Sequence, residues 1–175
     1  TPRVLEVERF DRMGPLGRQG LISLSALDAE FVGGGSSSWP DLTQHLAKGG
    51  HITREASERA SLLWAFGTLI GNSDMHNGNL SFIAEQGRPH ELAPAYDMTP
   101  MGFAPRNSGG LPDSLPEANI HASVSNERWR KAEMLARDFM SRLATSSGFS
   151  RRFGGCIEVL REHLQTAGGR IGRLG

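Results

Sequence analysis

The chain has 175 residues, 38% of them hydrophobic, which is enough for one domain with a core and too few for two ordinary domains. Lysine plus arginine equals aspartate plus glutamate at 19 each, so composition gives no argument for nucleic acid or an anionic membrane as the main partner. A single cysteine excludes an intrachain disulfide and no apolar run approaches the ~20 residues that cross a bilayer, so we expect a cytoplasmic protein.

The N-terminal part is predicted to be a strand followed by loops. Residues 4–10 (VLEVERF) are rich in β-formers and predict a strand, and residues 11–20 predict a Gly/Pro loop. Residues 20–25 form a second short apolar piece, in which Ser25 is a candidate cap for a short helix. Because the chain starts with Thr1, almost directly on a strand, we expect it to be a piece of a longer protein.

Two helices follow a loop rich in glycine and serine. Residues 33–38 (GGGSSS) lack the spacing of a phosphate-binding loop and predict a flexible surface linker. Ser38 is the predicted N-cap of a helix that ends at Gly49, and Thr53 is the predicted N-cap of the strongest helix, which ends at Gly71. The buried face of that helix follows a helical period: Leu62, Leu63, Phe66, Leu69 and Ile70.

The middle of the chain predicts a polar loop and a small hairpin. The loop spans residues 72–79, and the hairpin pairs residues 80–84 with residues 90–92 around Gln86-Gly87-Arg88. Residues 103–119, rich in Gly, Pro, Ser and Asn, predict an extended loop.

The C-terminal third predicts two helices. Ser125 or Asn126 starts the first helix and Ser150 starts the second, while the glycines of residues 168–175 predict a frayed end. The fold class is therefore mainly α (α+β), with one small hairpin inserted among the helices.

The loop and the segment after the hairpin carry the residues with the clearest chemistry. Asp74 and Asn79 stand five positions apart in a loop that can turn both toward one point, and Asp97 follows Asn79 by 18 positions. Phosphoryl transfer needs an oriented hydroxyl and neutralised phosphate charge. Asp74 can accept the hydroxyl proton, and Asn79 and Asp97 offer the hard oxygen ligands that Mg²⁺ prefers. His76 is a candidate catalytic-site residue that hydrogen-bonds within the loop and orients Asp74.

Two other interpretations of these residues remain open. Asn, Asp and Gly are common turn formers, so the loop can be a set of simple turns. Alternatively Asp74, His76 and Asp97 can surround a metal ion in a nuclease.

The order of the motifs resembles a known family. LIGNSDMHNGNLSF, then LAPAYDM, is similar to the C-terminal lobe of HipA-like kinases, the toxins of bacterial toxin–antitoxin pairs. VERFDR at residues 7–12 resembles the stretch that joins the two lobes of that family, and the resemblance covers nearly the whole chain. The sequences of residues 96–101 (YDMTPM) and residues 14–33 are most similar to a side branch of the family, the YjjJ or HipH type.

The resemblance implies a protein-kinase-like C-lobe and a Ser/Thr protein kinase that uses ATP and Mg²⁺. Asp74 matches the catalytic aspartate of the family, and Asn79 and Asp97 match its metal-holding pair. Glu8 and Phe10 match linker positions whose main chain meets the adenine. The partners implied are a protein substrate and a small DNA-binding antitoxin.

The chain departs from the family in the region that grips the nucleotide. Residues 1–20 correspond to the interlobe linker and residues 21–175 to the C-lobe, and we find no N-lobe. The only lysines, Lys48 and Lys131, lie on predicted solvent-facing helices. We therefore expect this fragment alone to be inactive, and a non-catalytic module that binds an antitoxin, DNA or a nucleotide is the alternative function.

Overall fold

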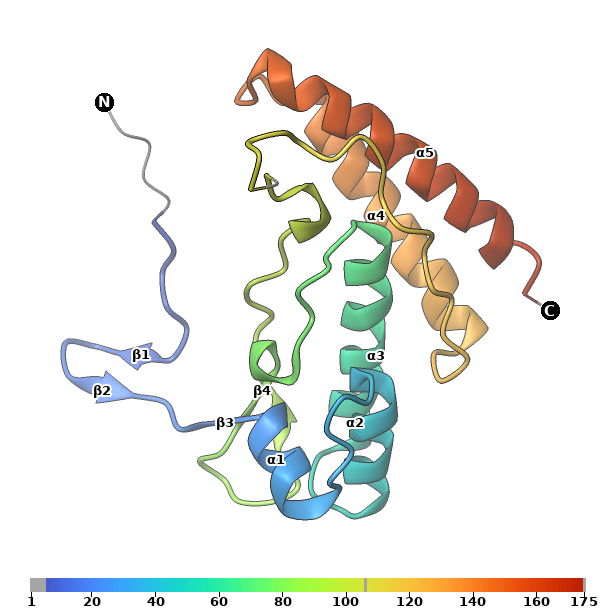
Figure 1. The fold of residues 1–175 in the computed structure, drawn as a ribbon. Coiled ribbons are helices and arrows are strands. Elements are labelled where there is room, and N and C mark those ends of the chain that lie inside the picture. Colours follow the sequence, from blue (N-terminus) through green and yellow to red (C-terminus); the bar gives the residue numbers. More distant parts are fainter. Residues whose placement is uncertain (1–5, 106, 175) are drawn as a thin grey trace.

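The computed structural model describes residues 6–105 and 107–174, without the side chain of Arg152, and it has an α+β architecture (Figure 1). Its helices are Leu24–Phe31 (α1), Trp39–Lys48 (α2), Arg54–Leu69 (α3), Asn126–Thr145 (α4) and Gly154–Ile171 (α5), with 3₁₀ turns at Asn77–Asn79 (η1), Met101–Phe103 (η2) and Arg151–Phe153 (η3). Across the described residues, no helix combines the length and the apolar character that a membrane span requires.

Two small antiparallel sheets complete the described fold. The strands are Arg12–Met13 (β1), Gly17–Arg18 (β2), Leu21–Ser23 (β3), Ser81–Ile83 (β4) and Glu91–Leu92 (β5). β1 and β2 form a hairpin that stands away from the helical body (Figure 1), and β3, β4 and β5 form the second sheet in that order. Phe82 of β4 lies opposite Ile22 and Leu92, which confirms the predicted hairpin and adds β3 to it.

Side-chain caps set most helix starts where the sequence predicts them. Ser38, Thr53 and Ser125 each accept a hydrogen bond from the backbone N–H three residues ahead. Gly71 adopts φ +74° immediately after α3, a conformation that favours glycine and ends the helix. The cap of α1 is Ser23 rather than the expected Ser25, because β3 extends to Ser23 before the helix begins.

α3 is the central helix, and it contributes to two apolar clusters. Its first half packs with α1, α2 and β4, where Leu24, Trp39 and Phe82 are fully buried. Its second half packs with α4 and α5 around Trp129. The partly buried Trp64 contacts both clusters, so α3 joins them into one continuous interior. The end of α3 is thereby a rigid base for the polar loop that follows.

Two predictions for the chain ends are wrong. The expected strand over residues 4–10 is not formed at residues 6–10, whose backbone pairs with no strand, and its first two residues lie outside the described part. Pairing starts only at β1, where the chain turns back through Gly14 at φ +60°. At the other end the helix continues through the glycines to Ile171, because that side chain is fully buried in the core.

The long irregular segment after η2 is fastened to α2 by Asp41. The carboxylate of Asp41 accepts hydrogen bonds from the hydroxyls of Ser123 and Ser38, and His121 Nε2 lies 3.6 Å from it. The Ser123 bond, the Ser38 bond and the positive charge that His121 can carry hold the pKa of the Asp41 carboxyl below its ordinary value of 3.8.

We expect Asp41→Asn to lower the free energy of unfolding by about 1 kcal/mol at neutral pH, because it weakens bonds made to a charged acceptor. Since the pKa of Asp41 is lowered by folding, its contribution is complete above the unfolded pKa and is lost as the pH falls below 3.8. Urea titrations at several pH values should show the two proteins converging in acid. If the free energies of unfolding of the wild type and Asp41→Asn differ by the same amount at pH 3 and pH 7, this role of Asp41 is contradicted.

Candidate active site

The polar loop after α3 holds the backbone of Asp74 from both sides. The Asp74 N–H donates to Asn72 Oδ1 at 3.0 Å, and the Asp74 carbonyl accepts from Asn79 Nδ2 at 2.9 Å. Asn72 is buried, so the anchor on the N-terminal side belongs to the interior. The Asp74 side chain is exposed, and its carboxylate forms no hydrogen bond or ion pair with any described residue. The loop therefore presents a free carboxylate on a fixed backbone.

His76 organises the centre of the same loop. Its Nδ1 accepts the N–H of Gly78 at 3.0 Å and so caps η1. Its carbonyl accepts the indole N–H of Trp39, a fully buried side chain of α2, at 3.3 Å. The expected hydrogen bonding of His76 within the loop is confirmed. Its assignment as a catalytic residue remains a prediction.

The chain around Asp97 lies against this loop. The Tyr96 hydroxyl donates to the Gly78 carbonyl at 3.0 Å, so it accepts from the Ser81 hydroxyl, 2.6 Å away. On the other side of Asp97, the sulfur of Met98 lies 4.0 Å from Asn72 Nδ2. The neighbours of Asp97 thus contact both ends of the segment that carries Asp74. Residues far apart in the sequence are brought to one place.

Asp97 itself has an unusual backbone conformation. Its φ of 52° is the one positive value found at a non-glycine residue in the described part of the chain. Aspartate tolerates this left-handed region better than most residues, but the conformation still carries strain of order 1 kcal/mol or more. Strained residues of this kind concentrate at functional sites. Nearby, Met75 and Met98 occupy the space above Gly67, where a Cβ would lie 2.3 Å from the Met75 sulfur.

The proposed adenine positions border a separate hollow next to Tyr96. Glu8 and Phe10 line a cavity of about 420 Å³ together with Leu21 and Tyr96. The rings of Phe10 and Tyr96 lie 6.0 Å apart at 32°. The cavity is bounded largely by apolar surface, as a site for a flat aromatic base would be. Tyr96 therefore links this hollow to the loop of Asp74.

The oxygen atoms available for a metal ion fit Mg²⁺ better than zinc. Asn79 uses its amide N–H on the loop, which leaves Oδ1 as a neutral oxygen. In the described part of the chain, no group of three His, Cys, Asp or Glu side chains is placed to hold a metal ion. Asp74, His76 and Asp97, the alternative set, accordingly form no such group among the described residues. Mg²⁺ commonly needs only one or two carboxylates, with phosphate and water completing its shell.

The glycine-rich segment before α2 is a structured support of the site, which corrects the predicted flexible linker. Asp28 is 5% exposed, and its carboxylate accepts the N–H groups of Gly34 and Gly35 at 2.7 and 2.9 Å. The Gly35 carbonyl in turn accepts from Asn77 Nδ2 at 2.9 Å. Charge-assisted bonds of this kind are stronger than neutral ones. The only signal in the sequence was an aspartate five residues before a triple glycine, which does not indicate such a contact.

Comparison with known proteins identifies the family of the chain. The model of the HipA-like C-terminal domain matches residues 1–167, so the chain belongs to that family. The toxin YjjJ of Escherichia coli (strain K12) is 36% identical over 171 residues, which cover 98% of this chain and 38% of that protein. The "Putative kinase Y4dM" of Sinorhizobium fredii (strain NBRC 101917 / NGR234) is 30% identical over 102 residues, 57% of this chain and 21% of that protein. The chain thus spans well under half the length of either relative.

Proposed function

We propose that this chain is the catalytic C-terminal lobe of a HipA-like toxin kinase. The full-length protein would transfer the γ-phosphoryl group of ATP to a Ser or Thr hydroxyl of a protein substrate, within a bacterial toxin–antitoxin system. The observation that carries the proposal is the approach of Asp97 to the loop of Asp74 and Asn79 through Tyr96 and Met98. The family match and the two relatives, whose names are a toxin and a "putative kinase", support it.

Each residue has a role that its local geometry suits. Asp74 presents an exposed carboxylate that can orient and deprotonate the attacking hydroxyl. Asn79 Oδ1 and the Asp97 carboxylate would hold Mg²⁺, which neutralises phosphate charge when it is bound. His76 fixes the loop through Gly78.

The nucleotide base would lie beside the linker. The main chain at Glu8 and Phe10 would contact the adenine, and the Phe10 and Tyr96 rings would border it. Tyr96 then connects base binding to the metal site because it is adjacent to Asp97 and bonded to Gly78. Use of ATP and a protein substrate implies a cytoplasmic location.

Replacing Asp97 tests the proposed metal site. We expect Asp97→Asn in the full-length protein to weaken Mg²⁺-dependent binding of a non-hydrolysable ATP analogue at least tenfold, because one anionic ligand is lost. Calorimetry with and without Mg²⁺ measures the effect. Asp138→Asn on α4 is the matched control, since Asp138 is exposed and, among the described residues, pairs only with Arg142 four residues along the helix.

The outcomes separate the candidate functions. Equal Mg²⁺-dependent binding by wild type and Asp97→Asn would overturn the metal role of Asp97. Tight nucleotide binding without transfer to any protein, from the intact enzyme, would instead favour a non-catalytic binding module.

A further inference from the structure

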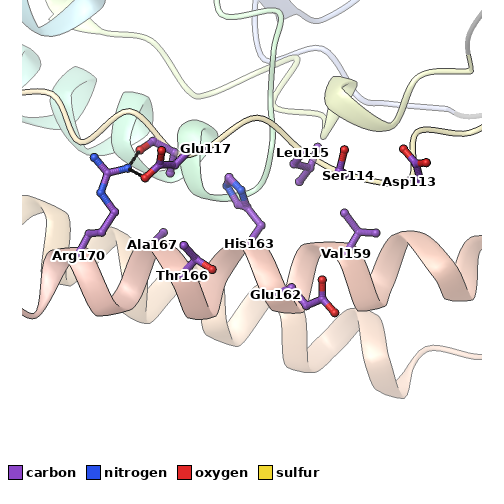
Figure 2. A pocket seen from close by; sticks show the side chains of 11 residues that line it. Asp113, Ser114, Leu115, Glu117, Val159, Glu162, His163, Thr166, Ala167 and Arg170 are labelled. Atoms are coloured by element: carbon purple, nitrogen blue, oxygen red, sulfur yellow. Dashed lines mark hydrogen bonds and ion pairs between the residues drawn. The ribbon is translucent and has the colours of Figure 1, made fainter.

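A groove runs from the loop of Asp74 to the middle of α5. One cavity of about 260 Å³ separates residues 113–119 from α5 (Figure 2), and another of about 220 Å³ separates the same segment from residues 71–75. The two cavities share Leu115, Glu117, Ala118 and His163, so they adjoin each other, and we call them together the 113–119 groove.

The segment that shapes the groove is fastened at both ends. Leu115 packs where Gly71 and Gly102 lack side chains, since a Cβ on either glycine would lie within 3 Å of its methyl groups. At the other end, Arg170 Nη1 donates to Glu117 Oε1 at 2.6 Å and to the Ala118 carbonyl at 2.7 Å (Figure 2). The groove is therefore formed before any ligand arrives, which reduces the ordering cost of binding.

His163 connects the floor of the groove to the candidate catalytic loop. Its Nε2 donates to the Thr68 carbonyl in the last turn of α3 at 3.2 Å, which satisfies a carbonyl at a helix end. Ser73 and Met75, the two neighbours of Asp74, line the groove at its other end. An occupant of the groove would thus lie beside the loop that carries Asp74, whose carboxylate is proposed to receive the hydroxyl proton.

Among the described residues, Glu162 is the acidic group that remains available in the groove near α5. Of the other two acidic residues that line this part, Glu117 is bonded to Arg170 and Asp113 has a partner of its own. Glu162 is exposed on α5 and forms no hydrogen bond or ion pair with another described residue. The remaining lining is largely apolar. This combination complements a side chain with an apolar stem and a positive head, as in arginine or lysine.

We propose that the 113–119 groove binds an extended stretch of the protein substrate, with the acceptor Ser or Thr at the Asp74 end and an arginine or lysine at Glu162. This inference rests on the proposed kinase function and specifies the kind of sequence that the kinase recognises. Glu162 is then a specificity-determining residue, remote from the reacting atoms.

A positional-scanning library of Ser- and Thr-centred peptides, with ATP and Mg²⁺, tests the proposal in the full-length protein. We expect wild type to phosphorylate pools with Arg or Lys at one or two positions about three- to tenfold faster than the matched Glu pools. Glu162→Lys should reverse the preference, so that Glu pools are phosphorylated faster than Arg or Lys pools. Glu162→Gln should make the rates for the two kinds of pool similar. Glu30→Lys makes the same charge change at an exposed position of α1 outside the groove and should keep the wild-type preference.

The results distinguish the groove proposal from the proposed kinase function on which it rests. Transfer that depends on Asp74 but shows no basic preference, or an unchanged preference in Glu162→Lys, would overturn the groove proposal alone. No transfer above that of Asp74→Asn would overturn both proposals. If Glu162→Lys fails to fold, Glu162→Gln decides, because it keeps the shape of the side chain.

Discussion

Asp74→Asn is expected to reduce phosphoryl transfer by the full-length protein by about 10²–10⁴-fold, the usual contribution of a positioned proton acceptor. The substitution keeps the size of the side chain, and the two anchoring bonds use only the Asp74 backbone, so the loop geometry is retained. The carboxylate is exposed and bonded to no described residue, so we expect the melting temperature to stay within about 1 °C of the wild type.

Transfer of labelled phosphate to protein or peptide substrates measures this effect, and calorimetry with the ATP analogue measures nucleotide binding separately. Asp138→Asn serves again as the control for loss of one exposed carboxylate. We expect ATP binding to be retained in Asp74→Asn, because Asp74 is not assigned to the metal. An intact enzyme that keeps most of its activity without this carboxylate would refute the role of Asp74 as the base.

Trp39→Ala is expected to cost about 3–5 kcal/mol of the free energy of unfolding, the largest effect on stability among our predictions. Trp39 is fully buried, its ring meets the edge of Trp64 at 5.7 Å, and its indole N–H donates to the His76 carbonyl. The alanine variant therefore loses a large apolar contact, and the backbone of the candidate catalytic loop loses its link to α2. Urea unfolding followed by circular dichroism measures the loss.

Trp39→Phe separates packing from loop positioning. It keeps most of the apolar surface and removes the N–H donor, so we expect a modest stability loss and a clear loss of transfer in folded protein. Trp129→Phe is a matched control, because Trp129 is also buried and donates its indole N–H to a backbone carbonyl, that of His121, in the other cluster. Equal losses of transfer in the two phenylalanine variants would contradict a specific role for the Trp39–His76 bond.

Several parts of the fold can be predicted from the sequence because they depend on interactions between residues that are close in the chain. The caps at Ser38, Thr53 and Ser125 and the end of α3 at Gly71 each depend on residues within one turn. The hairpin of β4 and β5 depends on apolar strands around a turn. The exceptions also have physical reasons, since residues 6–10 of the expected strand find no partner in the described part of the chain and the last helix is extended by burial of Ile171.

The candidate site could be predicted only in part from the sequence. The residue types and order of Asp74, Asn79 and Asp97 indicated the chemistry, and the family match supports that interpretation. Nothing local indicated that Tyr96 would bond to Gly78 or that Asp28 would hold the triple glycine. Such contacts depend on how helices and sheets pack, and similar polar residues form simple turns in other settings.

The amino-acid sequence by itself determined the helices, the hairpin and the set of side chains that we propose for phosphoryl transfer, because periodicity, caps and turn residues act over a few positions. Only the tertiary structure decided which of those side chains lie together. Packing of α3 against both apolar clusters fixes the loop after it, and the bonds of Tyr96 and Asn72 bring the chain of Asp97 to that loop. The 113–119 groove likewise exists only because Leu115 and Arg170 fasten a segment that has no regular structure of its own.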